Sequence, residues 1–337
     1  MKTKKLNMNR RNFLRFLSIG TAHILVSPLY GTPYKYVNAD PLQKVKLGNS
    51  GIETTLVGFG TGINGVQREA FLVKQDKQKS IALLLHAWER GIRYFDCADS
   101  YGTHGLMAEA LKQMDRERLT LTTKIWVRED LRLIPEPERP DANIVVDRFR
   151  RELNTDYLDI VQLHCLIDGN WTDSQKRQMD ILDNLKAKGI IKAHGVSVHS
   201  IKAMKAAVEC PWVDVIHVRI NPYGMAMNIP EIDYSQNKYH NEKINPDGIE
   251  MDISKSEELE EVVQVIHKLH HAGKGVIGMK LIGGGLMQND SEKINNTLRF
   301  VLGLGSVDMI VIGFEGISQV DDYLNRTKNT LYQLKTD

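Results

Sequence analysis

Residues 94–98 (YFDCA), 119–125 (LTLTTKI) and 158–165 (LDIVQLHC) are three largely apolar runs of strand length, and stretches of helical character separate them. Five more runs extend the pattern in both directions, at 56–60, 193–198, 213–220, 275–282 and 309–314. Runs without strict alternation are typical of parallel strands that helices cover. Eight strands alternating with helices predict an α/β fold, namely a single-domain (β/α)₈ TIM barrel.

The stretches between these runs have the spacing of amphipathic helices. One apolar face repeats at i, i+3, i+4 and i+7 in Ile81, Leu84, Leu85 and Trp88. A doubly wound sheet is the alternative fold, but Gly58-Phe59-Gly60-Thr61-Gly62 lacks the third glycine of a dinucleotide-binding fingerprint. Residues 221–255, after the sixth strand, form the longest irregular stretch, and we expect them to be a loop on the catalytic face of the barrel.

The composition limits the class of protein. The chain has 337 residues, of which 42% are hydrophobic, so it is long and apolar enough for one large folded domain. Its 44 basic and 42 acidic residues give a net charge of +2, which argues against a dedicated nucleic-acid binder. Three scattered cysteines are too few for a disulfide framework or a cysteine-rich zinc site. We therefore expect a globular protein that binds neither nucleic acid nor a metal.

The first 39 residues have the layout of an export signal. A basic head precedes Arg10 and Arg11, an apolar run follows from 13 to 29, and Val37-Asn38-Ala39 offers small residues for cleavage. The arginine pair followed by Phe-Leu resembles a twin-arginine signal. A basic amphipathic helix is the alternative. The sequence thus predicts a signal at 1–39 and a barrel at 40–337.

This division has consequences for location and charge. The predicted partner is the twin-arginine export machinery, and the predicted location is outside the cytoplasm, in the periplasm. Away from the N-terminus no apolar run is long enough for a membrane helix, so we expect no stable membrane span in the mature chain. Residues 1–39 hold seven basic and no acidic residues, and without them 37 basic and 42 acidic residues leave a net charge of −5.

Titratable side chains stand at or just past the ends of three consecutive predicted strands. They are Asp96 within the second strand and Tyr101 just past it, Lys124 near the end of the third strand and His164 near the end of the fourth. Singly, each is better explained by a structural role. Together they meet at the carboxyl end of the barrel, where catalytic residues collect.

These residue types suit proton delivery to a carbonyl oxygen. A free tyrosine has a pKa near 10, which a neighbouring lysine ammonium is expected to lower. An aspartate beside the lysine keeps the ammonium charged, and a histidine can hold the substrate oxygen.

The motif 91–102 (GIRYFDCADSYG) resembles the signature of the aldo-keto reductase family. The segments around Leu47–Gly51, Gly58–Thr61, 153–164 (LNTDYLDIVQLH) and 188–197 (KGIIKAHGVS) resemble it in the same order, so the likeness covers roughly residues 45–325. The resemblance implies a barrel that binds NADP(H) or NAD(H). It also implies that Tyr101 is the general acid, that Lys124 and Asp96 tune it, and that His164 orients the carbonyl.

The resemblance further implies a set of cofactor positions, in which this sequence departs from the family pattern. The usual Asn after Ser197 is absent, and His199 is either its substitute or an ordinary loop histidine. His217 replaces a Gln, and Ile220 replaces a stacking Tyr unless Tyr223 reaches in. The implied cofactor-binding residues are Gly60, Thr61, Ser197, His217, Ile220, Lys280, Gly283, Gly284, Gly313, Gln319 and Asp322.

Three features at or near these positions leave a choice open. The glycines after Lys280 suit either a pyrophosphate or a flexible turn. Glu315 and Gln319 stand where the family often holds the 2′-phosphate of NADP, which slightly favours NAD. Arg219 is expected either to bind an anionic group or to pair with a structural carboxylate.

The leading functional prediction is an NAD(P)-dependent oxidoreductase that transfers a hydride between the nucleotide and a carbonyl or alcohol substrate, which would be an aldehyde, a ketone or a sugar-like molecule. The alternative is a nucleotide-binding regulatory barrel with little or no turnover. A lyase or hydrolase that uses a metal is a third class, but no HxH or HExxH cluster supports it.

Overall fold

The computed structural model describes residues 36, 38–128, 134–224 and 256–336. Most of the predicted signal and residues 225–255 of the predicted loop lie outside these ranges. Eight parallel strands close into a barrel, which confirms the predicted (β/α)₈ TIM barrel. Around the barrel their order is β3 (Val57–Gly60), β4 (Tyr94–Asp96), β5 (Thr120–Trp126), β6 (Leu158–Leu166), β7 (Ile191–Val198), β8 (Val215–Arg219), β9 (Gly275–Met279) and β10 (Met309–Gly313).

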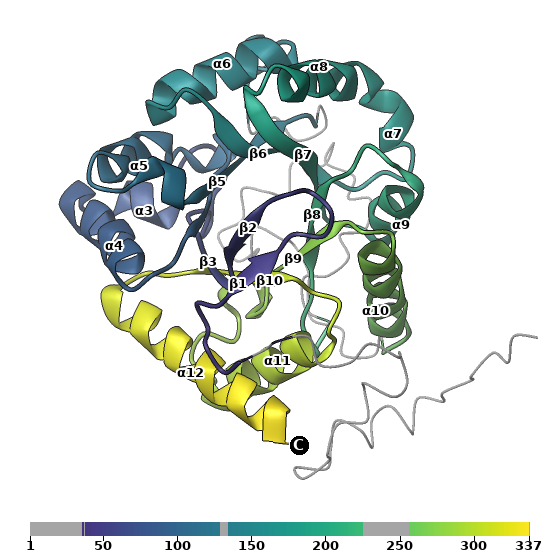
Figure 1. The fold of residues 1–337 in the computed structure, drawn as a ribbon. Helices are drawn as coiled ribbons and strands as arrows, with labels where there is room; N and C mark the ends of the chain where they lie inside the picture. Colours follow the sequence, from purple (N-terminus) through teal and green to yellow (C-terminus); the bar gives the residue numbers. More distant parts are fainter. Residues whose placement is uncertain (1–35, 37, 129–133, 225–255, 337) are drawn as a thin grey trace, which may run out of the picture.

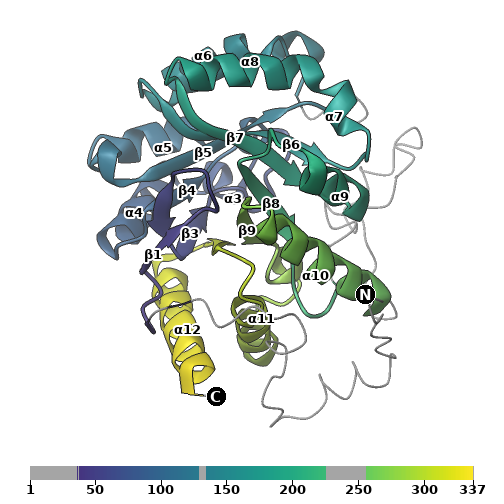
Figure 2. The same ribbon diagram turned by 45° about the vertical axis from the view of Figure 1, so that its right-hand side comes forward.

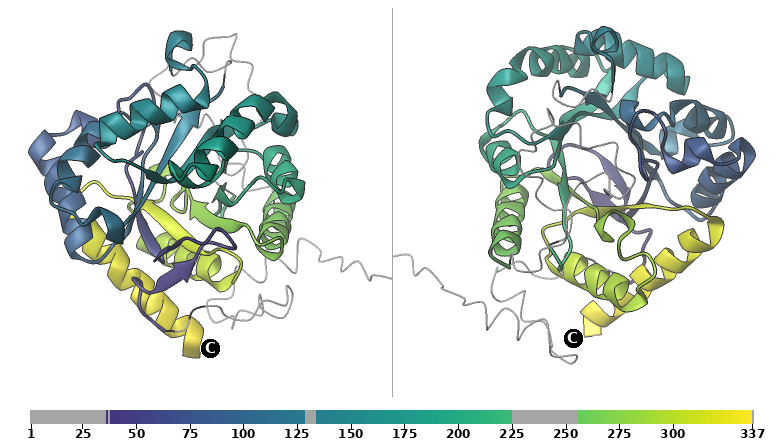
Figure 3. Two further views of the ribbon diagram at one scale, coloured as in Figure 1. Left: turned by 45° about the horizontal axis from the view of Figure 1, so that its top comes forward. Right: turned by 180° about the vertical axis from the view of Figure 1, so that it is seen from behind.

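Helices form an outer ring around the strands (Figures 1 and 3). The long helices are α4 (Lys77–Glu89), α5 (His104–Leu111), α6 (Ala142–Leu153), α8 (Lys176–Ala187), α9 (Ile201–Glu209), α10 (Ser256–His271), α11 (Ser291–Gly303) and α12 (Ile317–Thr336). Neighbours in the chain are neighbours in the ring, and Figure 2 shows α9 and α10 side by side. The short elements are α3 (Phe71–Lys74), α7 (Trp171–Ser174) and the 3₁₀ turns η1 (Asp99–Tyr101), η2 (Arg116–Arg118), η3 (Glu136–Glu138) and η6 (Gly283–Gly285).

The hairpin of β1 (Lys44–Lys46) and β2 (Glu53–Thr55) lies across the amino-terminal end of the barrel (Figure 1). Leu47 is fully buried there, and a Cβ on Gly275 would come within 2.8 Å of its side chain. Gly48 has a φ of +49°, and its backbone lies so close to Gly273 that any Cβ would clash. The hairpin therefore closes the amino-terminal end of the barrel, so a functional site is expected at the carboxyl end.

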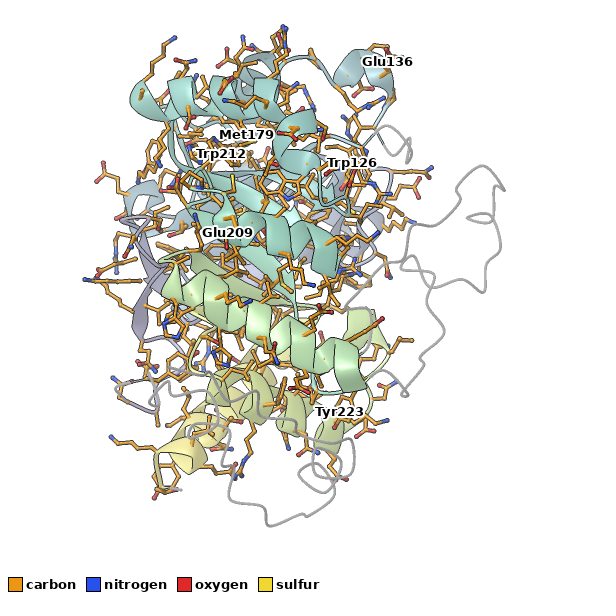
Figure 4. The ribbon with its side chains drawn as sticks, turned by 90° about the vertical axis from the view of Figure 1, so that its right-hand side faces the viewer. Trp126, Glu136, Met179, Glu209, Trp212 and Tyr223 are labelled. Atoms are coloured by element: carbon orange, nitrogen blue, oxygen red, sulfur yellow. The ribbon has the colours of Figure 1, made fainter. Side chains whose placement is uncertain are left out.

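Strand alternation selects the side chains that point into the barrel. In the register of the sheet Asp96 pairs with Thr122 and Trp126 pairs with His164, so every second residue of β4, β5 and β6 faces inward together. This places Asp96, Lys124 and His164 on the inner surface, at the carboxyl ends of three adjacent strands. Figure 4 shows Trp126 and Tyr223 toward this end, and Glu209 and Trp212 toward the opposite end.

Tyr36 packs on the barrel although it precedes the predicted cleavage site at Ala39. Its side chain is buried, and its hydroxyl donates a hydrogen bond to the carbonyl of Val307 at 2.8 Å. Cleavage after Ala39 would remove this contact from the mature chain. In the described ranges no helix is long and apolar enough to cross a membrane.

Candidate active site

The four predicted catalytic residues meet at the carboxyl end of the barrel. The Nζ atom of Lys124 donates to Asp96 Oδ1 at 2.5 Å, to the Cys97 carbonyl at 3.0 Å and to the Tyr101 hydroxyl at 3.5 Å. The Tyr101 ring meets the His164 ring edge-on, with centroids 5.5 Å apart. The lysine is completely buried, so its charge is balanced chiefly by the carboxylate beside it.

The Tyr101 ring is held by the backbone of the preceding loop. It belongs to η1, which ends at Gly102 with a φ of +74°. A Cβ on Gly62 would lie 2.4 Å from the ring, and a Cβ on Gly65 would lie 2.5 Å from it. Both glycines therefore fix the ring by close backbone approach. Sequence reasoning did not single out this role, although Gly62 lies in a quoted glycine motif.

An ion-pair network supports the same loop. Asp99 is almost fully buried and accepts from Arg68 at 2.9 Å and from Arg148 at 2.6 Å. The backbone N–H of Arg68 also donates to the Ser100 carbonyl at 2.7 Å. These contacts tie the turn that carries Tyr101 to helix α6, a connection that residue spacing could not reveal.

Burial raises the pKa of Tyr101 well above its usual value, and the nearby Asp96 carboxylate raises it further. The sequence suggested the opposite direction, because Lys124 was expected to favour the phenolate. Since Asp96 lies closer to Lys124 than the tyrosine does, it offsets the ammonium charge. Tyr101 is thus held as the phenol, which is the form that donates a proton.

Burial and then the charge of Lys124 lower the pKa of His164 well below its usual value, so the imidazole is neutral. Its Nδ1 atom is buried without a hydrogen-bond partner in the described part of the chain. Its Nε2 atom is neither bonded nor enclosed there, so it is the ring nitrogen that can meet a substrate.

His217 lies beneath the four residues rather than beside them. It is fully buried, with Nε2 3.4 Å from Asp96 Oδ1 and 3.4 Å from the Tyr94 hydroxyl. Burial is the main reason why its pKa is well below the usual value. The structure therefore brings His217 to the carboxylate that holds Lys124, and not to the open end of the barrel.

His199, Cys165 and Arg219 form a second cluster beside His164. The Nδ1 atom of His199 lies 2.7 Å from Arg219 Nη2 and 2.9 Å from Cys165 Sγ. Because a guanidinium only donates, Nδ1 is the unprotonated nitrogen and Nε2 carries the hydrogen. His199 is half-buried, and Cys165, which contacts it, has an unusual φ of +62°.

The other predicted cofactor residues are distributed around the same end. Gly60 and Gly313 end the neighbouring strands β3 and β10. Ser197 lies near the end of β7, and within the described ranges its buried Oγ has no hydrogen-bond partner. Thr61 is engaged internally, since its hydroxyl donates to the Asp96 carbonyl at 2.8 Å. Ile220 is fully buried and would touch a Cβ on the outward-facing Gly278, so the structure packs it between barrel and helices.

The segment after β9 bends sharply. Lys280, Gly283 and Gly284 have φ values of +59°, +60° and +70°. Further along, Gln319 in the first turn of α12 accepts from the backbone N–H of Glu315 at 2.7 Å. Asp322 accepts from Arg326 at 2.6 Å, so these two predicted cofactor residues both have partners within the chain.

The comparison with known proteins assigns the family. Residues 56–302 match the model described as the Aldo/keto reductase family. The chain belongs to this family. Among the aldo/keto reductases of known structure, the holo form of a Bacillus halodurans enzyme aligns over 87% of this chain and 96% of its own, with a TM-score of 0.59 and 19% identity. At that identity the likeness concerns the fold.

Curated relatives match over shorter lengths. "Probable aldo-keto reductase 1" of Glycine max is 30% identical over 131 residues, which is 36% of each chain. "Uncharacterized oxidoreductase YqkF" of Bacillus subtilis is 28% identical over 162 residues, or 46% of this chain and 49% of that protein. The chain thus spans between about a third and a half of the length of these relatives.

Aldo/keto reductases in general use NADP(H) or NAD(H), and the described residues fit such a group. The Oγ of Ser197, which has no hydrogen-bond partner among the described residues, and the Nε2–H of His199 suit the carboxamide of a nicotinamide, which both donates and accepts hydrogen bonds. The left-handed turn at 280–285 lets backbone approach a phosphate closely. In the described ranges no group of three or more His, Cys, Asp or Glu side chains is arranged for a metal ion.

Proposed function

We propose that this aldo/keto reductase is an oxidoreductase that transfers a hydride between a nicotinamide nucleotide and a carbonyl or alcohol substrate, with Tyr101 as the proton donor. The observation that carries the proposal is the convergence of the Tyr101 hydroxyl, the Lys124–Asp96 pair and the neutral His164 at one end of the barrel. The presence of an oxidoreductase among the relatives supports it.

The chain's own residues account for the proton and for the orientation of the substrate. A bound nicotinamide nucleotide, held by Ser197, His199 and the turn at 280–285, would supply or accept the hydride. The Nε2 atom of His164 donates to the carbonyl oxygen and fixes its approach. As that oxygen gains negative charge, Tyr101 transfers its proton to it. Lys124 then stabilises the phenolate that remains.

The substitution Tyr101→Phe tests the proton donor. We expect kcat to fall by about 10²- to 10⁴-fold, since that is the usual contribution of a positioned general acid. Binding of the nucleotide, followed by its fluorescence, should change little. The exposed Tyr332 provides the matched control, and Tyr332→Phe should leave both measurements as they are. Turnover that survives in Tyr101→Phe would show that the proton donor is misassigned.

A second candidate function is a nucleotide-binding barrel with little turnover. It is favoured by the placement of His217 and Ile220, which lie below or outside the open end and leave fewer contacts for a nicotinamide. The same assay separates the two functions. Nucleotide binding without turnover on a broad panel of aldehydes, ketones and alcohols would support the second.

We also propose NAD(H) as the preferred nucleotide. Glu315 stands just before α12, and a carboxylate there repels a 2′-phosphate but suits a free ribose hydroxyl. Dissociation constants for NADH and NADPH, measured by fluorescence, test this preference. Tighter binding of NADPH would overturn it.

We further propose that residues 1–39 direct the protein through the twin-arginine machinery to the periplasm. Changing Arg10 and Arg11 to Lys together should retain the protein in the cytoplasm, and N-terminal sequencing of the exported form should begin at Asp40. An exported form that begins before Tyr36 would instead keep the hydrogen bond to Val307 and place cleavage elsewhere.

A further inference from the structure

The segment 61–70, which joins β3 to α3, packs against both the ring and the main chain of Tyr101. Two of its glycines lie against the ring, as described above. Further along, the backbone N–H of Arg68 donates to the Ser100 carbonyl at 2.7 Å, and that of Ala70 donates to the Tyr101 carbonyl at 3.2 Å. The position of the proposed proton donor therefore depends on how this segment is held.

Arg68 lies in a left-handed conformation within this segment. Its φ is +62°, and Asn64 and Gln67 have φ values of +50° and +53°. Residues with a Cβ rarely adopt this region, and they keep it only where surrounding contacts determine it. One such contact is with Gly102, where a Cβ would lie 2.3 Å from the Arg68 carbonyl oxygen. The strained backbone thus brings Arg68 directly onto the end of the turn that carries Tyr101.

The guanidinium of Arg68 bridges two carboxylates that belong to different loops. Its Nη2 atom donates to Asp99 Oδ1 at 2.9 Å, and Asp99 is in the same turn as Tyr101. Its Nη1 atom lies 2.6 Å from Glu138 Oε2, in the segment between β5 and α6. The Asp99 side chain is 3% exposed and the Glu138 side chain is 42% exposed. A planar guanidinium suits this role, because it presents several N–H donors in fixed directions.

The segment that contains Glu138 supports the side of the site where His164 lies. Ile134, near its start, is fully buried in one cluster with Trp126. The Trp126 ring in turn meets the His164 ring edge-on, with centroids 5.3 Å apart. Figure 4 shows Trp126 and Glu136, the first residue of η3, toward the same side of the molecule. This segment is thus the outer support of the residue proposed to orient the carbonyl.

We propose that Arg68 is a positioning residue for the reaction: by joining Asp99 to Glu138, it fixes the separation of the two side chains that meet the substrate oxygen. These side chains are those of Tyr101 and His164. The inference rests on the proposed reductase function and deepens it. Arg68 itself touches no reacting atom and acts through the two loops that it joins, so its loss should affect the rate of the reaction more than the binding of the nucleotide.

The substitution Arg68→Gln tests this role, because it removes both ion pairs and keeps a polar side chain. We expect kcat to fall by about 10- to 100-fold, since a displacement of about 1 Å can cost about 10²-fold in rate. The dissociation constant of the nucleotide should change by less than about threefold, because the interaction lost is one that matters in the transition state.

Two milder variants grade the effect. Arg68→Lys keeps the charge but lacks the planar fork that reaches two carboxylates, so it should restore only part of the lost kcat. Glu138→Gln removes only the exposed ion pair, and kcat should fall by about 2- to 5-fold, as an exposed pair of this kind provides. Glu138→Gln also carries the test if Arg68→Gln does not fold, and an unchanged kcat in it would then overturn the proposal.

Arg177→Gln is the matched control, since Arg177 forms a two-point pair with Asp141 on the outer ring of helices. It should keep the native kcat. A native kcat in Arg68→Gln would overturn the proposal. A lower kcat would overturn it too if the melting temperature and nucleotide binding fell with it and Arg68→Lys restored nothing, because that pattern indicates a general loss of structure.

Hydrogen exchange followed by mass spectrometry separates this inference from the proposed function, because it needs no turnover. Arg68→Gln should speed exchange about 10-fold in the peptides that cover 61–71, 98–103 and 134–139, as the loss of a charge-assisted contact allows. If exchange responds in this way but the native protein shows no nucleotide-dependent turnover, the reductase proposal fails and the bridge stands. If turnover is found but exchange in 134–139 does not respond, the bridge fails and the reductase stands.

Discussion

The two halves of the carboxyl end of the barrel differ in how their polar residues are used. On the side of β4, β5 and β6, Asp96, Lys124 and His164 point inward from adjacent strands and meet Tyr101. On the side of β7 to β10, the polar residues bond mainly to one another, as His199 does with Arg219 and Asp322 with Arg326. In the proposed function the first half supplies the reacting residues, and the second half contacts the nucleotide.

The difference follows from where the residues sit. A residue on a strand has its direction fixed by the two-residue alternation, so sequence position determines which side chains meet. A residue past the strand end takes its direction from its tertiary partners. Single substitutions in the first half should therefore change activity or stability strongly. Single substitutions in the second half should change binding only moderately.

The largest effect is expected from Lys124→Met, which leaves Asp96 buried without its cation. Removing one partner of a buried pair costs about 3–5 kcal/mol of unfolding free energy. Urea denaturation followed by circular dichroism measures the loss. Lys176→Met is the control, since Lys176 forms an exposed pair with Asp180 one helical turn away, and it should change stability little. A fully stable Lys124→Met protein would mean that the pair does not balance the charge at this site.

Gly62→Ala should lower activity more than stability. The added Cβ would lie 2.4 Å from the Tyr101 ring, which must shift, and a displacement of about 1 Å can cost about 10²-fold in rate. Steady-state kinetics beside a melting curve measure both effects. Gly105→Ala in α5, where no atom lies within 4 Å of the new Cβ, is the control. Normal kcat in Gly62→Ala would show that the loop does not position the tyrosine.

A third effect concerns acid stability. The pKa values of His164 and His217 are lowered in the folded state, so the unfolded chain takes up protons first as the pH falls. The stabilisation that comes from keeping these histidines neutral is complete above about pH 6.5. Below it the free energy of unfolding falls by up to about 1.4 kcal/mol per pH unit for each histidine. Urea unfolding between pH 7.5 and 5.5 should show this loss. His217→Gln should reduce the slope, and an unchanged slope would contradict the assignment.

The smallest effect is expected in the second half of the site. Glu315→Ser should improve NADPH binding relative to NADH by about 5-fold, because one partly screened repulsion is removed. Glu209→Ser removes the same charge and is the control, because Figure 4 places Glu209 toward the opposite end of the barrel. If both variants shift the ratio alike, Glu315 does not face the nucleotide.

The sequence by itself determined the barrel and placed the proposed reacting residues at one end of it. Unbroken apolar runs set the parallel strands, and the alternation within them placed Asp96, Lys124 and His164 at one end. Tyr101 could be added because a short turn follows β4 directly. Each inference depended on spacing along one strand, which the chain itself encodes.

Only the tertiary structure decided the surroundings of those residues. It turned His217 toward Asp96, buried Ile220 beneath the helices and joined His199 to Cys165 and Arg219 from three strand ends. It also reversed the expected direction of the pKa of Tyr101. Burial and the distance between charges set these properties, and both arise only when segments far apart in the chain are packed together.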